Sequence, residues 1–163
     1  MIIKAYDGTN FHTVSEVLAT LMNEYTYKNL NHKTKEKFLG IFSEVGSKDP
    51  HVLMELERTL ATSDIWIAYD SNEITGIVRG VRDNVLNLFV KREHSRKGIG
   101  TALLNVFEDK CLSEGFPAVR LSSTIEAITF YENSGYKKTT GLRTARYSGS
   151  KGFDYQPMIK VLF

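Results

Sequence analysis

Two glycines in a basic loop are the residues of this sequence best suited to chemistry. Gly98 and Gly100 directly follow Arg96 and Lys97, and Arg92 lies a few positions earlier. Glycine lets the backbone turn sharply and come close to a ligand. If a helix begins here, its first N–H groups have no partner inside the helix and point at one spot. Such a helix start is an anion site, and a phosphate is the anion we expect there.

The residues around the glycine pair predict the elements that hold it. The apolar run Val85–Val90 has the length of a strand and shows little alternation, which favours a strand covered on both faces. After the glycines, apolar residues recur at helical spacing and end before Gly115 and Pro117, the usual punctuation of a helix C-terminus. The apolar positions of this helix are Ile99, Leu103, Val106, Phe107 and Cys111. The pattern therefore predicts a strand, a basic loop and a helix, with the anion site at their junction.

Length and composition favour one ordinary globular domain over residues 1–163. The chain is 42% hydrophobic and 25% charged, and its net charge of +2 does not indicate nucleic-acid or membrane-surface binding. The single cysteine, Cys111, excludes an intrachain disulfide framework and a cysteine cluster for zinc. His12, His32 and His51 have no ligand spacing, so we expect no metal. The start of the chain lacks a signal-peptide pattern and no apolar run could span a bilayer, so we expect a cytoplasmic protein.

The first third of the chain reads as one strand followed by helices. A strand is predicted over 2–6, and a capping-box pattern at Thr13–Glu16 predicts a helix over 13–26. The polar stretch 27–37 is expected to be loop, followed by a short helix that ends near Gly46. Asp49 and Pro50 have the types expected at the start of a further helix.

The rest of the chain is richer in strands. Three predicted strands, at 65–69, 74–81 and 85–90, form an antiparallel meander, and another follows at 118–121. A second capping box at Ser123–Glu126 predicts a short helix that Gly135 closes. The remaining predictions are a strand within 136–146, a loop at 148–152 and a last strand at 155–163.

This order of elements resembles the GNAT superfamily of acyl-CoA-dependent N-acetyltransferases. One motif of that family matches Leu88-Phe89-Val90 followed by Ser95-Arg96-Lys97-Gly98-Ile99-Gly100. A second motif matches Ala127, Phe130, Tyr131, Gly135 and Tyr136. Each motif alone is weak, but the two in order, separated by a helix and a strand, are specific. Two positions depart from the family pattern: Ser95 replaces a Gln or Arg, and Thr124 replaces an Asn that often holds the cofactor arm.

The resemblance implies an α+β (α/β) fold with a mixed, mostly antiparallel sheet of about six to seven strands flanked by about four to five helices. It implies an acetyl-CoA:amine N-acetyltransferase, in which a primary amine attacks the thioester directly in a ternary complex. The pantetheine arm would lie beside the strand and a backbone N–H near Phe89 or Val90 would stabilise the oxyanion. The implied acetyl-CoA-binding residues are Leu88, Phe89, Val90, Ser95, Arg96, Lys97, Gly98, Ile99, Gly100 and Thr101.

Tyr131 occupies the position from which family members protonate the leaving thiolate. A phenol with an ordinary pKa of about 10 is a workable donor to a thiolate whose acid has a pKa of about 8.5. The alternative is that Tyr131 only packs its helix on the sheet, which is the reading we prefer for Phe130. Cys111 reads as a packing residue, because it lies on the core side of its helix.

The general base and the acceptor are not identified by the sequence. Asn87 occupies a strand position where a base can lie, but an amide cannot act as one. Glu73 and Glu126 are candidates for the base, and the alternative is that each is a solvated turn or cap residue. His94 reads as a phosphate-side or surface residue. Five aromatic residues are candidates to line the amine pocket or to pack as ordinary core: Tyr25, Tyr27, Tyr147, Phe153 and Tyr155. Peptide, amino-acid and small-amine acceptors all stay open.

Two other functions compete with the enzyme. One is a non-catalytic acyl-CoA-binding sensor or regulatory domain, which the Ser95 and Asn87 departures keep open. The other is a phosphate or nucleic-acid module built on Lys91–Lys97, against which the near-neutral charge argues. We expect no nucleic-acid or membrane partner. A homodimer is common in the family and stays open.

Overall fold

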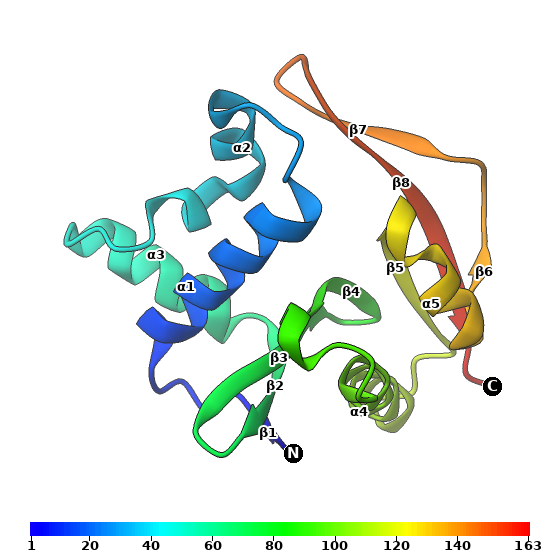
Figure 1. Ribbon diagram of the computed structural model, residues 1–163. Coiled ribbons are helices and arrows are strands. Elements are labelled where there is room, and N and C mark those ends of the chain that lie inside the picture. Colours follow the sequence, from blue (N-terminus) through cyan, green and yellow to red (C-terminus); the bar gives the residue numbers. More distant parts are fainter. The chain divides into compact units, whose positions relative to one another are not determined.

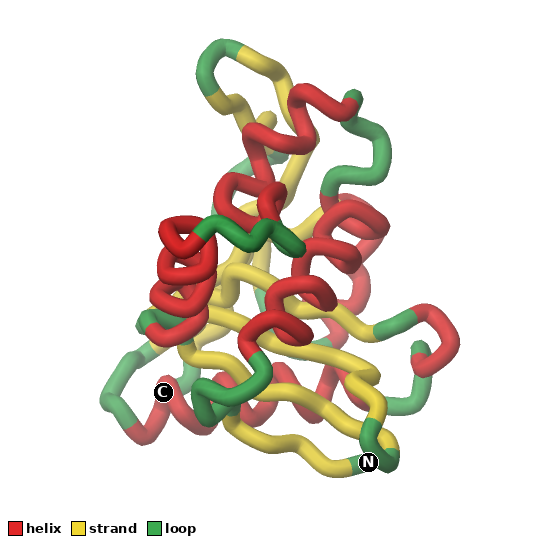
Figure 2. Tube along the Cα trace, turned by 90° about the vertical axis from the view of Figure 1, so that its left-hand side faces the viewer, coloured by secondary structure: helices red, strands yellow, loops and turns green.

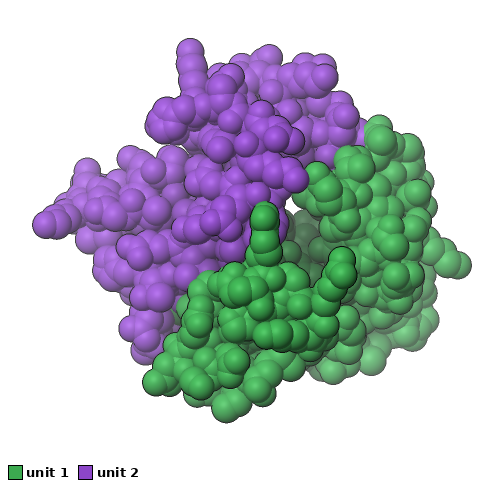
Figure 3. Space-filling model, in the orientation of Figure 1, with its two compact units in different colours: residues 1–6, 63–142, 156–163 green, residues 7–62, 143–155 purple.

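The computed structural model describes residues 1–163, which form five α-helices and eight strands (Figures 1 and 2). The chain divides into two units, coloured separately in Figure 3. Unit 1 comprises residues 1–6, 63–142 and 156–163, and unit 2 comprises residues 7–62 and 143–155. The mixed, mostly antiparallel sheet and the five helices confirm the predicted fold class, with eight strands in place of six or seven.

Unit 1 contains most of the sheet. Its strands run in the order β1-β2-β3-β4-β5-β8-β6. They are β1 (Ile2–Ala5), β2 (Asp64–Asp70), β3 (Glu73–Val81), β4 (Asn84–Val90), β5 (Ala118–Thr124), β6 (Lys137–Lys138) and the end of β8 (Ser150–Val161). The predicted meander β2–β3–β4 is confirmed as antiparallel, whereas β4 and β5 are parallel. A parallel pair needs a crossover connection, and the long helix α4 (Ile99–Ser113) provides it.

Helix α4 packs closely on β3 because two glycines lack side chains there. A Cβ on Gly80 would overlap the Phe107 ring, and a Cβ on Gly76 would lie 3.0 Å from side-chain atoms of Ile99 and Leu103. The apolar face of α4 therefore sinks against the strand, and Leu103 and Phe107 are fully buried. One buried apolar cluster of unit 1 comprises Ala68, Val78, Val85, Ile99, Leu103, Leu104, Phe107, Cys111, Val119, Leu121, Tyr131, Tyr136 and Met158.

The end of β5 leads into a short helical segment that completes unit 1. A 3-10 turn spans Ile125–Ala127, and α5 (Ile128–Asn133) follows directly. Gly135, with a φ of 93°, ends α5 as the sequence predicts, since glycine adopts this left-handed conformation without strain.

Unit 2 contains three α-helices and a β-hairpin. The helices are α1 (Phe11–Leu21), α2 (His32–Leu39) and α3 (Pro50–Ala61), and the hairpin joins β7 (Arg143–Tyr147) to the start of β8. Helix α1 continues as a π-helical turn over Met22–Thr26, and α2 as a 3-10 turn over Gly40–Glu44. The predicted start of α3 is confirmed, because the Asp49 carboxylate accepts a hydrogen bond of 2.9 Å from the His51 N–H. None of the helices has the length and apolar character needed to cross a bilayer.

Both predicted capping boxes are wrong. Helix α1 begins at Phe11, and Ser15 lies inside it, where its hydroxyl donates to the Phe11 carbonyl at 2.6 Å. A serine hydroxyl inside a helix commonly bonds the carbonyl one turn earlier, so the pattern alone does not fix the boundary. At the second site, the Ser123 hydroxyl bonds the Thr124 carbonyl and Thr124 provides no side-chain cap.

Three other boundaries differ from the prediction. The stretch 27–37 is not all loop, because the Asn31 side chain accepts a hydrogen bond of 2.9 Å from the Thr34 N–H and starts α2. The single strand expected within 136–146 is two strands, β6 and β7. The loop expected at 148–152 is shorter, since only Ser148 and Gly149 turn between β7 and β8.

Candidate functional site

The start of α4 presents backbone N–H groups without partners in the helix. Gly98 is the N-cap residue, with a φ of 79°, and no side chain caps the helix. The Ala102 N–H makes the bond to the Gly98 carbonyl, at 3.0 Å. The amides of Ile99, Gly100 and Thr101 therefore precede the first intrahelical bond and are available to an anion, as the sequence predicts.

Strands β4 and β5 pair over only two positions. The partners are Asn84 with Arg120 and Val85 with Leu121, whereas β3 accompanies β4 as far as Val90. The strands therefore separate beyond Val85. This separation opens the sheet of unit 1 next to the start of α4.

A cavity of about 390 Å³ lies at this opening, within unit 1. Its volume falls in the range of small-molecule sites. It is lined by residues of β4, the basic loop, the start of α4 and the segment after β5, namely Leu88, Val90, Ser95, Arg96, Gly98, Ile99, Gly100, Thr101, Ala127, Phe130 and Tyr131. The structure thus brings Tyr131 together with most of the predicted acetyl-CoA-binding residues.

Two predicted site residues lie outside this lining, and two others extend it. Phe89 is buried on β4 between Leu88 and Val90, so strand alternation turns its side chain to the opposite face. Lys97 is exposed and is not part of the lining. Phe130 lines the cavity although the sequence favoured a packing role, and Ala127 lies beside it. A Cβ on Gly100 would lie 3.4 Å from the Phe130 ring, so glycine lets α4 start close to α5.

The basic loop carries uncompensated positive charge at the cavity. Arg96 is exposed, adopts a left-handed φ of 61°, and lines the cavity with Ser95. The Ser95 hydroxyl contacts the Lys91 carbonyl at 3.4 Å. Lys91 itself is engaged by Glu73, at 2.9 Å. Positive charge next to unpaired amides suits a phosphate.

Tyr131 presents an unbonded hydroxyl to the cavity. Its ring packs between those of Phe130 and Tyr136, with centroids 5.1 and 5.7 Å away. Burial alone raises the pKa of Tyr131 above its ordinary value, and neither a hydrogen bond nor a charged neighbour contributes. The phenol is therefore protonated at any physiological pH and holds a proton at the cavity wall.

Tyr136 differs from Tyr131 because its hydroxyl is held in a buried network. It donates to a Glu108 carboxylate oxygen at 2.9 Å, and the other oxygen lies 2.6 Å from the Lys160 Nζ. Burial and the Glu108 charge raise the pKa of Tyr136. The Tyr136 N–H also donates to the Tyr131 carbonyl at 3.0 Å, so this network fixes the residue against which Tyr131 packs.

Neither carboxylate considered as a general base lines the cavity. The hydrogen bond and charge of Lys91 lower the pKa of Glu73, which makes it a weaker base. Glu126 is exposed on the 3-10 turn. Asn87 on β4 is held by Arg79, which donates to the Asn87 side-chain oxygen at 2.9 Å and to the Ser63 hydroxyl at 3.0 Å.

Two further features of unit 1 have structural explanations. Cys111 is fully buried, and burial raises the pKa of its thiol to about 11, which supports the packing interpretation. Glu73, Glu93 and His94 place ligand-type atoms within 4.8 Å of one another, a grouping that sequence spacing did not reveal. Lys91 already compensates Glu73 there, so these contacts are those of a surface ion-pair cluster.

The aromatic residues considered for the acceptor pocket belong to unit 2. Phe38 on α2 lies 5.7 Å from the Tyr27 ring, 6.1 Å from Tyr147 and 5.5 Å from Phe153, measured between centroids. Tyr155 packs next to Phe153, at 6.4 Å. These rings form one cluster between α2 and the β7–β8 hairpin.

The sequence profile of the acetyltransferase (GNAT) domain matches residues 23–162. The chain belongs to the GNAT acetyltransferase family. The match spans both family motifs and the cavity between them, so the resemblance drawn from those motifs is confirmed.

Individual GNAT relatives are distant in sequence. The chain is 34% identical over 94 residues to Probable N-acetyltransferase 14 of Xenopus tropicalis, which covers 52% of this chain. The matched stretch spans about half of that relative, 46% of its length.

Crystal structures of the family share the fold. A GCN5-related N-acetyltransferase from Rhodopseudomonas palustris superposes with a TM-score of 0.76 at 15% identity, covering 99% of this chain and 95% of its own. The PaiA N-acetyltransferase from Thermoplasma acidophilum, solved in complex with coenzyme A, gives 0.68 at 18% identity and covers 99% of each chain.

Proposed function

We propose that residues 1–163 act as one acetyl-CoA:amine N-acetyltransferase domain. The observation that carries the proposal is that one cavity of unit 1 joins the uncapped start of α4 to Tyr131. The helix start suits a phosphate, and Tyr131 holds a proton. Acyl transfer from a coenzyme A thioester needs both a site for the phosphates and a proton for the leaving sulfur. Membership of the GNAT family supports the same function.

The residues at the cavity fit the polar end of acetyl-CoA. Unpaired amides at Ile99, Gly100 and Thr101 would bind the pyrophosphate, with Arg96 adding charge. Leu88 and Val90 offer apolar surface and strand backbone for the pantetheine arm. We propose that a backbone N–H near Phe89 or Val90 donates to the acetyl carbonyl and stabilises the charge that develops there. The Ser95 departure fits this scheme, because the amides provide the main phosphate contacts.

Acetyl-CoA supplies an acetyl group that is already activated as a thioester. Cys111 is buried with a raised pKa, so the chain offers no thiol nucleophile there, and we propose direct attack by the amine. Tyr131 then protonates the displaced sulfur from the cavity wall. Its raised pKa keeps the proton in place but makes the transfer more costly than for an ordinary phenol. We propose that water takes the proton of the amine, since neither Glu73 nor Glu126 lines the cavity.

A non-catalytic acyl-CoA sensor is the second candidate, and one observation favours it. The structure shows no carboxylate among the residues that line the cavity. A sensor would need the phosphate site and the strand but neither Tyr131 nor an acceptor.

Two measurements separate these functions. Acetyl-CoA should raise the melting temperature, because a ligand that binds only the folded state stabilises it by about 2.7 kcal/mol at a hundred times its Kd. No shift would refute both functions. A panel of peptide, amino-acid and small-amine acceptors, followed by free thiol release, then distinguishes them: turnover with any amine supports the enzyme, and a shift without turnover supports the sensor.

A further inference from the structure

One face of unit 2 is strongly basic, although the chain as a whole is nearly neutral. The segments 27–39 and 143–155 contain seven basic and two acidic residues, against a net charge of +2 for all 163 residues. We call the surface of these segments the basic hairpin face. Its exposed or half-buried cations include Lys33, Lys35, Arg146 and Lys151.

The two segments form one surface because they are bonded to each other. The Lys37 Nζ lies 2.9 Å from the Ser150 hydroxyl, which ties α2 to the hairpin. The Phe38 ring packs on Tyr147 and Phe153, and a Cβ on Gly152 would overlap it. Figure 1 shows α2 and the turn of the hairpin next to each other at the top of the view.

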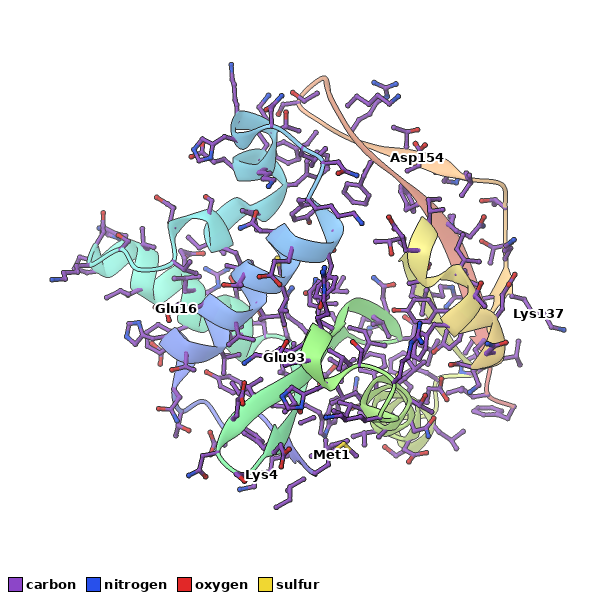
Figure 4. All side chains as sticks on the ribbon, in the orientation of Figure 1. Met1, Lys4, Glu16, Glu93, Lys137 and Asp154 are labelled. Atoms are coloured by element: carbon purple, nitrogen blue, oxygen red, sulfur yellow. The ribbon has the colours of Figure 1, made fainter.

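The two acidic residues do not neutralise the face. Glu36 lies 3.1 Å from His32, one turn away on α2. Asp154, labelled in Figure 4, accepts a hydrogen bond of 2.6 Å from the Thr144 hydroxyl across the hairpin. Lys33, Arg146 and Lys151 are exposed, and no carboxylate of the chain forms an ion pair with them.

The hairpin also places two cations directly opposite each other. Arg146 and Lys151 are register partners on β7 and β8, and both are exposed. Like charges at opposed positions of an antiparallel pair are destabilising. A carboxylate bound between them would relieve this repulsion.

We propose that the basic hairpin face docks an acidic polypeptide. The inference concerns this face of unit 2 alone and goes beyond the proposed acetyl transfer. The lysines of α2 and the cations of β7 and β8 suit a ligand with several carboxylates, and they repel polyamines and other polycations. Nucleic acid fits less well, because Phe38 and Phe153 are half-buried among other rings, which leaves Tyr147 as the one exposed ring of this cluster on which a base could stack.

The test measures binding of a fluorescent oligoglutamate peptide by anisotropy, with oligolysine and oligouridine of equal length as comparisons. The full chain should bind oligoglutamate in about 0.05 M NaCl, lose it in about 0.5 M NaCl, and bind neither comparison as tightly. The variant Arg146→Glu/Lys151→Glu keeps like charges opposed across the hairpin, so folding should be preserved. It should bind oligoglutamate at least about tenfold more weakly.

The matched control is Lys4→Glu/Lys137→Glu, which changes the net charge equally on exposed residues of unit 1, both labelled in Figure 4. It should bind oligoglutamate as the parent chain does. Equal weakening by both variants, no binding at low salt, or tighter binding of oligouridine would overturn the proposal. Acetyl-CoA melting shifts on the same proteins report the proposed function separately: intact shifts without peptide binding refute the docking face alone.

Discussion

Replacing Tyr131 by Phe removes the hydroxyl oxygen that we propose as proton donor and leaves the ring in place. Because that hydroxyl makes no hydrogen bond within the protein, the free energy of unfolding should change by less than about 0.5 kcal/mol. Loss of a positioned general acid typically lowers turnover about 10²- to 10⁴-fold. This corresponds to about 2.7–5.5 kcal/mol of activation free energy. Acetyl-CoA affinity should be unchanged, since the apolar wall is retained.

Tyr136→Phe is the matched control, because the same atom is lost from a neighbouring ring. There the hydroxyl donates to the buried Glu108 carboxylate at 2.9 Å, and a hydrogen bond to a charged group contributes about 1.5–3 kcal/mol. The melting temperature should fall by about 3–12 °C for a chain of this size. Tyr131→Phe should therefore lose turnover and keep its stability, whereas Tyr136→Phe should lose stability.

The assays are thiol release for turnover, calorimetry for acetyl-CoA affinity and thermal unfolding for stability. Unchanged turnover in Tyr131→Phe refutes the proton-donor role. A melting temperature that falls as far in Tyr131→Phe as in Tyr136→Phe refutes the statement that the Tyr131 hydroxyl is unbonded.

Three further predictions concern the core, the phosphate site and alkaline pH. Gly80→Ala should lower the free energy of unfolding in urea by about 1–3 kcal/mol, because its Cβ would overlap the Phe107 ring; Gly141→Ala, which meets nothing within 4 Å, should stay within about 0.5 kcal/mol. Gly98→Glu should abolish the acetyl-CoA melting shift through like charge at the phosphate site, and an intact shift would contradict that site. The pKa of Cys111 is raised from 9.0 to about 11, so the folded state holds a proton that the unfolded chain releases, and unfolding free energy should fall by about 2.7 kcal/mol as pH rises from about 9 to about 11. In Cys111→Ala the unfolding free energy, measured by urea titration at each pH, should fall less over this pH range. A fall equal to that of the parent chain would contradict the assignment to Cys111.

The core of the site was readable from local sequence because it is built from contiguous residues. A strand, a loop with Gly98 and Gly100, and a helix start determine the position of the amides almost without long-range information. The partnership with Tyr131 needed the second family motif, since the opening between β4 and β5 depends on strand pairing that no local pattern encodes. The Tyr136–Glu108–Lys160 network likewise joins three elements and has no sequence signature.

Boundaries were predicted less well than the elements themselves. Ser15 and Ser123 both have hydroxyls that satisfy nearby carbonyls, so the same residue types that cap helices also occur where no cap exists. Conversely, the Asn31 cap of α2 has no clear sequence signal, because the turn that follows it is rich in lysine and has little apolar periodicity. The loop predicted at 148–152 includes the first residues of β8, since glycine and serine have low strand propensity.

The close packing of α4 on β3 bears on how the phosphate site meets its ligand. Since Gly76 and Gly80 let α4 rest directly on the sheet, the amides at its start are fixed by the buried interior of unit 1. The donors are therefore already aimed before any ligand arrives, and binding spends little free energy on ordering them. Neither glycine lines the cavity. A side chain at either position would nevertheless tilt α4 and so weaken acetyl-CoA binding at a distance.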